Sequence, residues 1–230
     1  MAATSFTGFA DANKEPSFFH ALAKHQDREW FAAHKAEYET RWAGPMAALL
    51  AEARDALDGE YPDFELGAPK VFRIHRDVRF SADKSPYKTH ASGVLSLGHD
   101  TVKMDVAAAL YLQVGTETFA GAGTYGMEPP SLARFRAAVQ SDLGDELTKL
   151  LRPLEKKGFT LESMGMLKKA PRGVDPAHPR VELLKRKGLV VVFPPLAPEE
   201  LTSRKALTTL VKHAKAAAPV VRWVARAARE

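Results

Sequence analysis

Three strand-like segments follow one another in the middle of the chain, without a helical pattern between them. They cover residues 91–97, 106–114 and 118–125, and Gly115-Thr116 between the last two is typical of a hairpin turn. In the second segment apolar residues recur at every second position, as on one face of a strand. The residues of this face are Val106, Ala108, Leu110, Leu112 and Val114. Strands joined without crossover helices pair antiparallel, so we expect an α+β fold with a mostly antiparallel central sheet.

Helical patterns flank these strands on both sides. Residues 1–58 are expected to be helical, residues 65–126 to be rich in strands, and residues 129–230 to be mixed and mainly helical. The chain has no internal repeat and no linker, and its 230 residues fit one domain. We therefore expect a single domain over residues 1–230, with N-terminal and C-terminal helices packed on the sheet.

Capping and breaking residues place several helix ends. Asp27 is expected to be the N-cap of a helix, and Gly44-Pro45 is expected to break that same helix. In the last third, a helix that opens at Glu199 is expected to end near Lys215, where basic residues favour a helix C-terminus. Residues 220–229 would then form a separate helical segment.

The composition excludes several classes of protein. There is no cysteine, which rules out disulfides, thiolate catalysis and cysteine-ligated zinc. The eight histidines are scattered and form no HExxH motif, so no metal site and no cofactor are predicted. The first 16 residues lack the features of a secretory signal, and no apolar run is long enough to span a bilayer. We expect a soluble, cytoplasmic protein that does not enter membranes.

Basic residues are concentrated near the C-terminus. From Lys149 onward there are 18 Lys and Arg against 7 Asp and Glu, a net charge of +11, whereas the whole chain has +5. A basic third of this kind is compatible with binding to nucleic acid or to another acidic partner. A solvated, lysine-rich surface is the alternative interpretation.

Charged residues are densest between Arg73 and Phe80. If this segment is a strand, Arg73, His75, Asp77 and Arg79 share one face. Two guanidinium groups that flank one carboxylate are suited to an anionic ligand, and Asp77 would orient them or act as a base. An internal ion-pair network that holds the sheet to the helices is the alternative.

The other face of this segment is apolar except for Arg76. Its remaining members are Phe72, Ile74, Val78 and Phe80. A guanidinium among apolar side chains needs an acceptor, so we expect Arg76 to form a structural ion pair whose loss unfolds the protein.

Two further groups extend the predicted anion site. The loop after Phe80 contains Lys84 and Tyr87, stiffened by Pro86. Gly121 and Gly123 precede Tyr125 and leave one strand face bare, so that a backbone, a side chain or a ligand can approach. These glycines match neither a dinucleotide-binding fingerprint nor a P-loop.

A proline-rich loop contains Arg172, Asp175 and His178 at intervals of three residues. Arg172 is a candidate anion ligand. Asp175 and His178 are either an acid–base pair, with His178 as proton shuttle, or a local hydrogen bond.

The stretch from Arg73 to Tyr87 matches the pattern RxxRDxRFxxxKxPY at every specified position. It resembles the signature of a bacterial family known as domain of unknown function 2461. Further similarities are Trp30-Phe31, the glycine-rich strand that ends at Tyr125, and Pro171-Arg172-Gly173. The resemblance covers nearly the whole chain and implies a soluble α+β protein. It supplies no catalytic residue, so the roles assigned above rest on residue chemistry.

Three hypotheses follow for the function. In the first, a pocket binds a phosphorylated or carboxylated small molecule through Arg73, Arg79, Lys84 and Arg172, framed by Tyr87 and Tyr125. In the second, the basic C-terminal third binds nucleic acid. In the third, the protein is a non-enzymatic interaction module and the arginine-rich signature is its scaffold. Neither a reaction nor an oligomeric state follows from the sequence, and Asp77 and His178 are the candidate catalytic residues.

Overall fold

Six strands form one antiparallel sheet in the computed structural model, which describes residues 5–10, 12, 14, 17–98 and 106–229. Their order across the sheet is β1-β2-β3-β4-β6-β5. The strands are β1 (Lys70–Val71), β2 (His90–Ser96), β3 (Ala108–Gly115), β4 (Phe119–Thr124), β5 (Thr160–Glu162) and β6 (Leu189–Val192). The predicted α+β class and the mostly antiparallel sheet are therefore confirmed. The short edge strand β5 was not anticipated.

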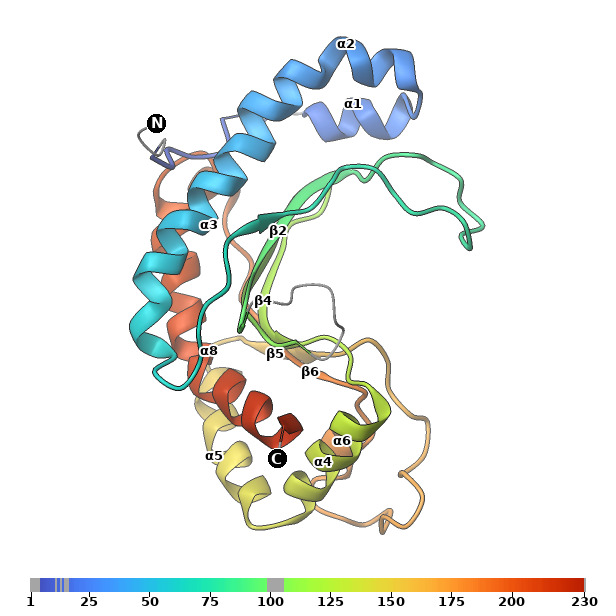
Figure 1. Cartoon of the computed structure of the whole chain (residues 1–230), viewed down its shortest axis with the longest axis vertical. Coiled ribbons are helices and arrows are strands. Elements are labelled where there is room, and N and C mark those ends of the chain that lie inside the picture. Colours follow the sequence, from blue (N-terminus) through green and yellow to red (C-terminus); the bar gives the residue numbers. More distant parts are fainter. Residues whose placement is uncertain (1–4, 11, 13, 15–16, 99–105, 230) are drawn as a thin grey trace.

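Helices precede and follow the strands along the chain (Figure 1). They are α1 (Phe18–Lys24), α2 (Arg28–Tyr38), α3 (Gly44–Leu57), α4 (Pro129–Gln140), α5 (Leu143–Glu155), α6 (Val181–Leu184), α7 (Pro198–Leu201) and α8 (Lys205–Arg229). The predicted N-cap of α2 is confirmed, because Asp27 Oδ1 accepts a hydrogen bond from the Trp30 amide at 2.7 Å. No helix of the described part combines the length and the apolar character needed to cross a membrane.

The break predicted at Gly44-Pro45 is wrong. A π-helical turn over Glu39–Ala43 joins α2 directly to α3, and the Gly44 amide donates to the Glu39 carbonyl five residues earlier. Pro45 stands in the first turn of α3, a position that tolerates proline, directly after the π-helical turn. The chain therefore bends at this point but stays helical.

The predicted end of a helix near Lys215 is also wrong. The helix α7 has only four residues, and α8 then runs through 25 residues with Pro219 inside it. Twelve of its side chains are buried against the sheet and other helices. This packing outweighs the hydrogen bond that Pro219 cannot make.

Two of these helices, α3 and α8, cover one face of the sheet (Figure 1). The contact between α3 and β2 is close. A Cβ atom on Gly93 would lie 2.5 Å from Leu50 Cδ1 of α3 and 2.8 Å from the Lys70 carbonyl oxygen, and the backbone contact makes this position require glycine. The opposite, concave face of the sheet is turned toward the opening of a C-shaped molecule.

The alternation predicted for residues 106–114 is only partly right. Leu110, Leu112 and Val114 are buried on the helix-covered face, as expected. Val106 and Ala108 instead line the concave side, because the register shifts between Ala108 and Tyr111. A bulge of this kind reverses the direction of the side chains that precede it.

Residues 72–89 form a projecting hairpin, here called the arm (Figure 1). Its two sides are joined by a bridge between His75 and Tyr87, and the Lys88 amide donates to the Ile74 carbonyl at 2.8 Å. The strand predicted over residues 73–80 is not a regular strand, because β1 ends at Val71. Pro86 lacks an amide hydrogen, which prevents a continuous ladder along the arm.

The two predicted faces of the arm are present along most of its length. Arg73, His75 and Asp77 are exposed, whereas Ile74 is buried. Phe80 is the exception, because its side chain at the tip is 96% exposed instead of belonging to an apolar face.

Candidate functional site

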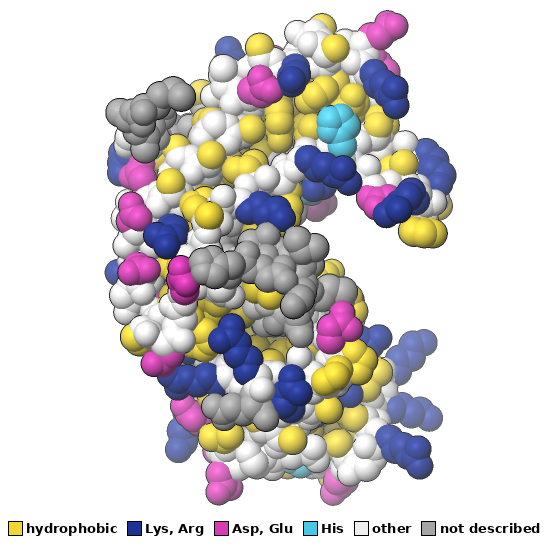
Figure 2. Space-filling model, viewed as in Figure 1, with side chains coloured by type: hydrophobic (Ala, Val, Ile, Leu, Met, Phe, Trp, Pro, Cys, Tyr) yellow, Lys and Arg dark blue, Asp and Glu magenta, His cyan; other side chains and the backbone are white. Residues whose placement is uncertain are grey.

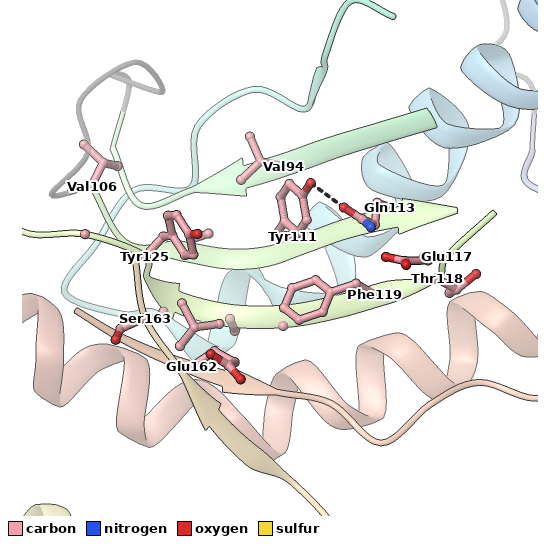
Figure 3. Close-up of a pocket in the computed structure, with 16 residues that line it drawn as sticks. Val94, Val106, Tyr111, Gln113, Glu117, Thr118, Phe119, Tyr125, Glu162 and Ser163 are labelled. Carbon is pink, nitrogen blue, oxygen red and sulfur yellow. Dashed lines mark hydrogen bonds between the residues drawn. The ribbon is translucent and has the colours of Figure 1, made fainter. Parts of the chain in front are cut away.

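The concave face of the sheet carries side chains from five neighbouring strands. Cross-strand pairing aligns Val94, Tyr111, Gly121 and Val192, and Tyr111 is half-buried. Figure 3 shows Tyr111, Phe119 and Tyr125 standing on this face, away from α8. The sheet therefore presents an aromatic surface on the side that α3 and α8 leave free.

A cavity of about 1010 Å³ lies over this face. Most of the surface around it is apolar or aromatic, and its polar contributions come from a small set of side chains. Those polar residues are Gln113, Glu117, Thr118, Glu162 and Ser163. The size is that of pockets which hold small organic molecules. The only charged side chains that line the cavity in the described part are carboxylates.

Three aromatic rings form a row across the sheet, here called the aromatic strip. The ring centre of Phe72, at the base of the arm, lies 6.4 Å from that of Tyr111. The ring centres of Tyr111 and Phe119 lie 6.0 Å apart. The Tyr111 hydroxyl donates to Gln113 Oε1 at 3.1 Å, as drawn in Figure 3. Burial raises the pKa of Tyr111, so the phenol is neutral and acts as a hydrogen-bond donor.

The two glycines of β4 form part of the cavity floor. A Cβ atom on Gly121 would lie 2.9 Å from the Val191 carbonyl oxygen, and one on Gly123 would lie 2.2 Å from that of Leu189. Gly123 also has a φ of +132°, which strains any other residue. The sequence left open whether a backbone, a side chain or a ligand lies close to these two glycines. In the structure the backbone of β6 lies against them.

Positive charge gathers where the arm joins the sheet. The Lys70 and Lys88 ammonium groups lie 5.8 and 5.5 Å from the centre of the Phe72 ring. Burial lowers the pKa of Lys88, and the nearby Arg73 guanidinium lowers it further. Lys88 forms no ion pair with any described residue. Burial, followed by the charge of Lys88, also lowers the pKa of His90.

Toward its tip the arm neutralises its own charges. Arg79 donates to both oxygens of Asp77, at 3.0 and 2.8 Å, and these bonds lower the pKa of Asp77 to about 2. Arg76 forms an ion pair with Asp83. The Lys84 ammonium donates to the Val78 carbonyl at 3.0 Å.

The tyrosines predicted to frame one pocket occupy different places. Tyr87 is buried and stacks on Phe31 of α2 with ring centres 4.5 Å apart, and its amide donates to Gln26 Oε1. It does not line the cavity. Tyr125 lines the cavity at the end of β4 and is 62% exposed.

The residues of the proline-rich loop bind their own backbone. Asp175 Oδ1 accepts from the Ala177 amide at 2.8 Å, and His178 Nδ1 accepts from the Arg180 amide at 3.0 Å. Arg172 is exposed and has no ion-pair partner within the described ranges. The structure therefore does not join Asp175, His178 and Arg172 to the arm or to the cavity. Across the described residues no cluster of acidic and histidine side chains could hold a metal ion.

Five basic residues of the last third form ion pairs within the chain. Arg180 bonds to Asp145, Arg204 to Glu52, Lys185 to Glu182, Lys215 to Glu60 and Arg226 to Asp63. The acidic partners come from several parts of the chain, so this charge is spread over the molecule.

Sequence reasoning missed the aromatic strip and Lys88. The sequence did contain one indication, in the residues that alternate with the expected buried positions of two strand segments. Tyr111 and Gln113 alternate with the buried residues of β3, and Phe72 was assigned only to an apolar face. Pairing between distant strands, which no local pattern reveals, brings the three rings together.

The chain matches the model of one protein family, described as "Conserved hypothetical protein (DUF2461)", over residues 15–223. It therefore belongs to this family, as the resemblance implied. Comparisons with curated proteins and with solved structures found no significant match.

Proposed function

We propose that the concave face of the sheet binds a phosphorylated or carboxylated small molecule with a flat apolar body. The body would lie on the aromatic strip, and the anionic group would lie beside Lys88 at the base of the arm. The observation that carries the proposal is the half-buried Lys88 ammonium, which has the Arg73 guanidinium as a neighbour and no carboxylate partner among the described residues.

The electrostatics of this cluster favour an anion. Like charges that gather at a partly desolvated position destabilise one another, and a bound anion offsets that cost. A lysine with a perturbed pKa is also a typical feature of a functional site. Lys88 lies over the Phe72 end of the aromatic strip, and the other two rings of the strip line the cavity. Arg73, which is exposed and near Lys88, is the residue of the predicted arginine pair that could reach the same anion.

The charged residues around the cavity favour one orientation of the bound ligand. Glu162 lines the cavity and would repel an anionic group, so that group belongs at the Lys88 end of the strip. Carboxylates accept hydrogen bonds from amino or hydroxyl groups. The preferred ligand therefore carries its donors on the end opposite the anion, toward Glu162.

Binding is proposed in preference to catalysis. Asp77 is held ionised by Arg79 and is a weak base, since its pKa lies at about 2. His178 already accepts a hydrogen bond from the Arg180 amide. In this proposal the arm is shaped by two ion pairs and by Lys84; the pairs are Arg79 with Asp77 and Arg76 with Asp83. Tyr87 anchors the arm.

A thermal-shift screen tests the proposal at low ionic strength. The panel comprises nucleotides, sugar phosphates, aromatic carboxylates, aliphatic dicarboxylates and short DNA and RNA. A ligand at a hundredfold its Kd stabilises the folded state by about 2.7 kcal/mol. Aromatic anions should stabilise the wild type and fail to stabilise Phe72→Ala, whereas the matched variant Phe80→Ala should respond normally. A panel without hits, or hits that survive Phe72→Ala, would refute the proposal. Hits confined to DNA or RNA would favour a nucleic-acid function.

A further inference from the structure

The cavity contains a side-chain donor that is held in place and has no acceptor among the described residues. Gln113 lines the cavity, and its Oε1 accepts a hydrogen bond from the Tyr111 hydroxyl at 3.1 Å. Figure 3 shows the Gln113 amide nitrogen, Nε2, on the side turned away from Tyr111. It donates to no residue of the described part. A half-buried amide in this state is a position at which a ligand can be recognised.

A second hydrogen bond determines which way the Gln113 amide faces. The side chain of Ser92 is buried and bonds to Tyr111. Burial raises the pKa of Tyr111, and the bond from Ser92 opposes that rise, as expected when Ser92 donates to the phenol oxygen. A phenol that accepts from one neighbour gives its own hydrogen to the other, here Gln113 Oε1. The relay from Ser92 through Tyr111 to Gln113 therefore presents an N–H, not a carbonyl, to the cavity.

Strand pairing places this amide within the aromatic strip. Gln113 lies opposite Ser92 of β2 on one side and Phe119 of β4 on the other, and the Phe72 amide donates to the Ser92 carbonyl at 2.8 Å. Neighbouring strands lie about 4.8 Å apart, so Gln113 is roughly two strand spacings from Phe72 and Lys88. A substituted aromatic ring on the strip can reach both ends of that span. Figure 2 shows the hollow of the C over this face, with Lys and Arg side chains along its arm side.

We propose that Gln113 determines the specificity of this site, and that its ligand is an aromatic anion whose ring carries a hydrogen-bond acceptor, such as a carbonyl oxygen or a ring nitrogen. The inference rests on the proposed function. The anionic group lies at Lys88, the acceptor receives the Gln113 amide, and the donors of the ligand face Glu162. An aromatic anion without the acceptor leaves the amide unpaired and binds more weakly, because a desolvated donor without a partner costs free energy. Tyr111 and Ser92 are positioning residues.

Calorimetric titration with matched pairs of probes tests the proposal. The meta- and para-acetylbenzoates carry the acceptor, and the corresponding isopropylbenzoates have nearly the same shape without it. The same pairs are also used as phenyl phosphates. The wild type should bind at least one acetyl probe roughly 2–10-fold more tightly than its isopropyl counterpart. Gln113→Leu should abolish this preference. Tyr111→Phe keeps the ring but lets the amide turn over, so it should reduce the preference. Gln140→Leu, at an exposed position of α4, is the matched control and should behave as the wild type.

The outcomes separate this inference from the function on which it rests. If none of the probes binds the wild type, both fail. If the probes bind, but the acetyl and isopropyl members of every pair have equal affinities, the site at Lys88 stands and the role of Gln113 is overturned. A preference that survives in Gln113→Leu would also overturn that role, since another group would then recognise the acceptor. Unchanged circular dichroism shows that each variant is folded.

The side-chain amide resonances of Gln113 in heteronuclear NMR spectra give a second readout, which does not depend on affinity. They are identified by their absence from the spectrum of Gln113→Leu. At equal saturation, the acetyl probe should shift them clearly more than its isopropyl counterpart, because both rings contribute the same ring current and only the acetyl probe accepts a hydrogen bond. Equal shifts for the two probes would overturn the proposed contact.

Discussion

The Lys88 ammonium lies 5.5 Å from the centre of the Phe72 ring, and the same ring begins the aromatic strip that crosses the sheet. Phe72 belongs to the first side of the arm, and Lys88 belongs to the second side, which leads back to the sheet. The base of the arm thus joins a cationic cluster to an aromatic surface, and this junction is the centre of the proposed binding site.

Glutamine in place of Glu52 should destabilise the protein by about 1 kcal/mol at neutral pH, because charge-assisted hydrogen bonds are weakened. Glu52 accepts from Arg204 at 2.6 Å and from the Phe6 amide at 2.6 Å, and these bonds lower its pKa to about 2. A carboxyl with a lowered pKa stabilises the fold above its unfolded value of 4.5 and loses that contribution as the pH falls toward 2. Urea unfolding of both proteins should therefore show a gap at neutral pH that closes in acid. A gap that is constant with pH would contradict this role.

Mild acid should destabilise the protein through His90. Burial lowers the pKa of His90 below 6.5, so the unfolded chain takes up a proton first as the pH falls. Stability is then complete above about pH 7 and declines from about pH 6.5 downward. The unfolding temperature of the wild type should fall over this range more than that of His90→Gln. The exposed His25, changed to Gln, is the control and should behave as the wild type.

Alanine at Gly123 should be far more damaging than alanine at Gly173. Both glycines have positive φ, +132° and +82°, so both substitutions strain the backbone by about 1–3 kcal/mol. At Gly123 the new methyl group would also lie 2.2 Å from the Leu189 carbonyl oxygen, whereas at Gly173 it meets nothing within 4 Å. Denaturant unfolding should give a clearly larger loss for Gly123→Ala. Equal losses would mean that β6 does not lie against β4 as described.

Arg76→Ala should leave the unfolding temperature near that of the wild type. The ion pair between Arg76 and Asp83 lies on the arm, and the Asp83 side chain is 60% exposed. Exposed pairs contribute little to stability. The expectation that loss of Arg76 unfolds the protein assumed a buried guanidinium, whereas the Arg76 side chain is 27% exposed. Collapse of this variant in a melting experiment would show that the arm packs against more of the chain.

The sequence was sufficient for most of the fold. Three successive strand patterns without helices between them predicted the antiparallel sheet, and Asp27 correctly marked the start of a helix. The errors at Gly44-Pro45 and at Lys215 have one cause, because local breaking signals were followed where tertiary packing keeps the helix continuous. The bulge between Ala108 and Tyr111 was missed for a related reason, since a strict alternation does not reveal a register shift.

The candidate site was harder to predict. The arginine-rich segment drew attention to Arg73, Arg79 and Lys84, and their functional roles remain predictions. The structure pairs Arg79 with Asp77 at the exposed part of the arm, and it places Phe72, Tyr111 and Phe119 in one row. Residues in that row are up to 47 positions apart in the sequence, Phe72 to Phe119. Such a row depends on strand register, which side-chain chemistry along the chain does not specify.

Calorimetric titration of the tightest aromatic anion into three proteins tests the central claim most directly. The proteins are the wild type, Lys88→Ala, and Lys84→Ala as a matched loss of one positive charge from the same arm. Loss of a charged partner at a partly buried site costs about 1.5–3 kcal/mol, or roughly 10–150-fold in Kd. We expect that loss for Lys88→Ala and a Kd near that of the wild type for Lys84→Ala. Equal affinities for all three proteins, or a loss confined to Lys84→Ala, would contradict a binding site at the base of the arm.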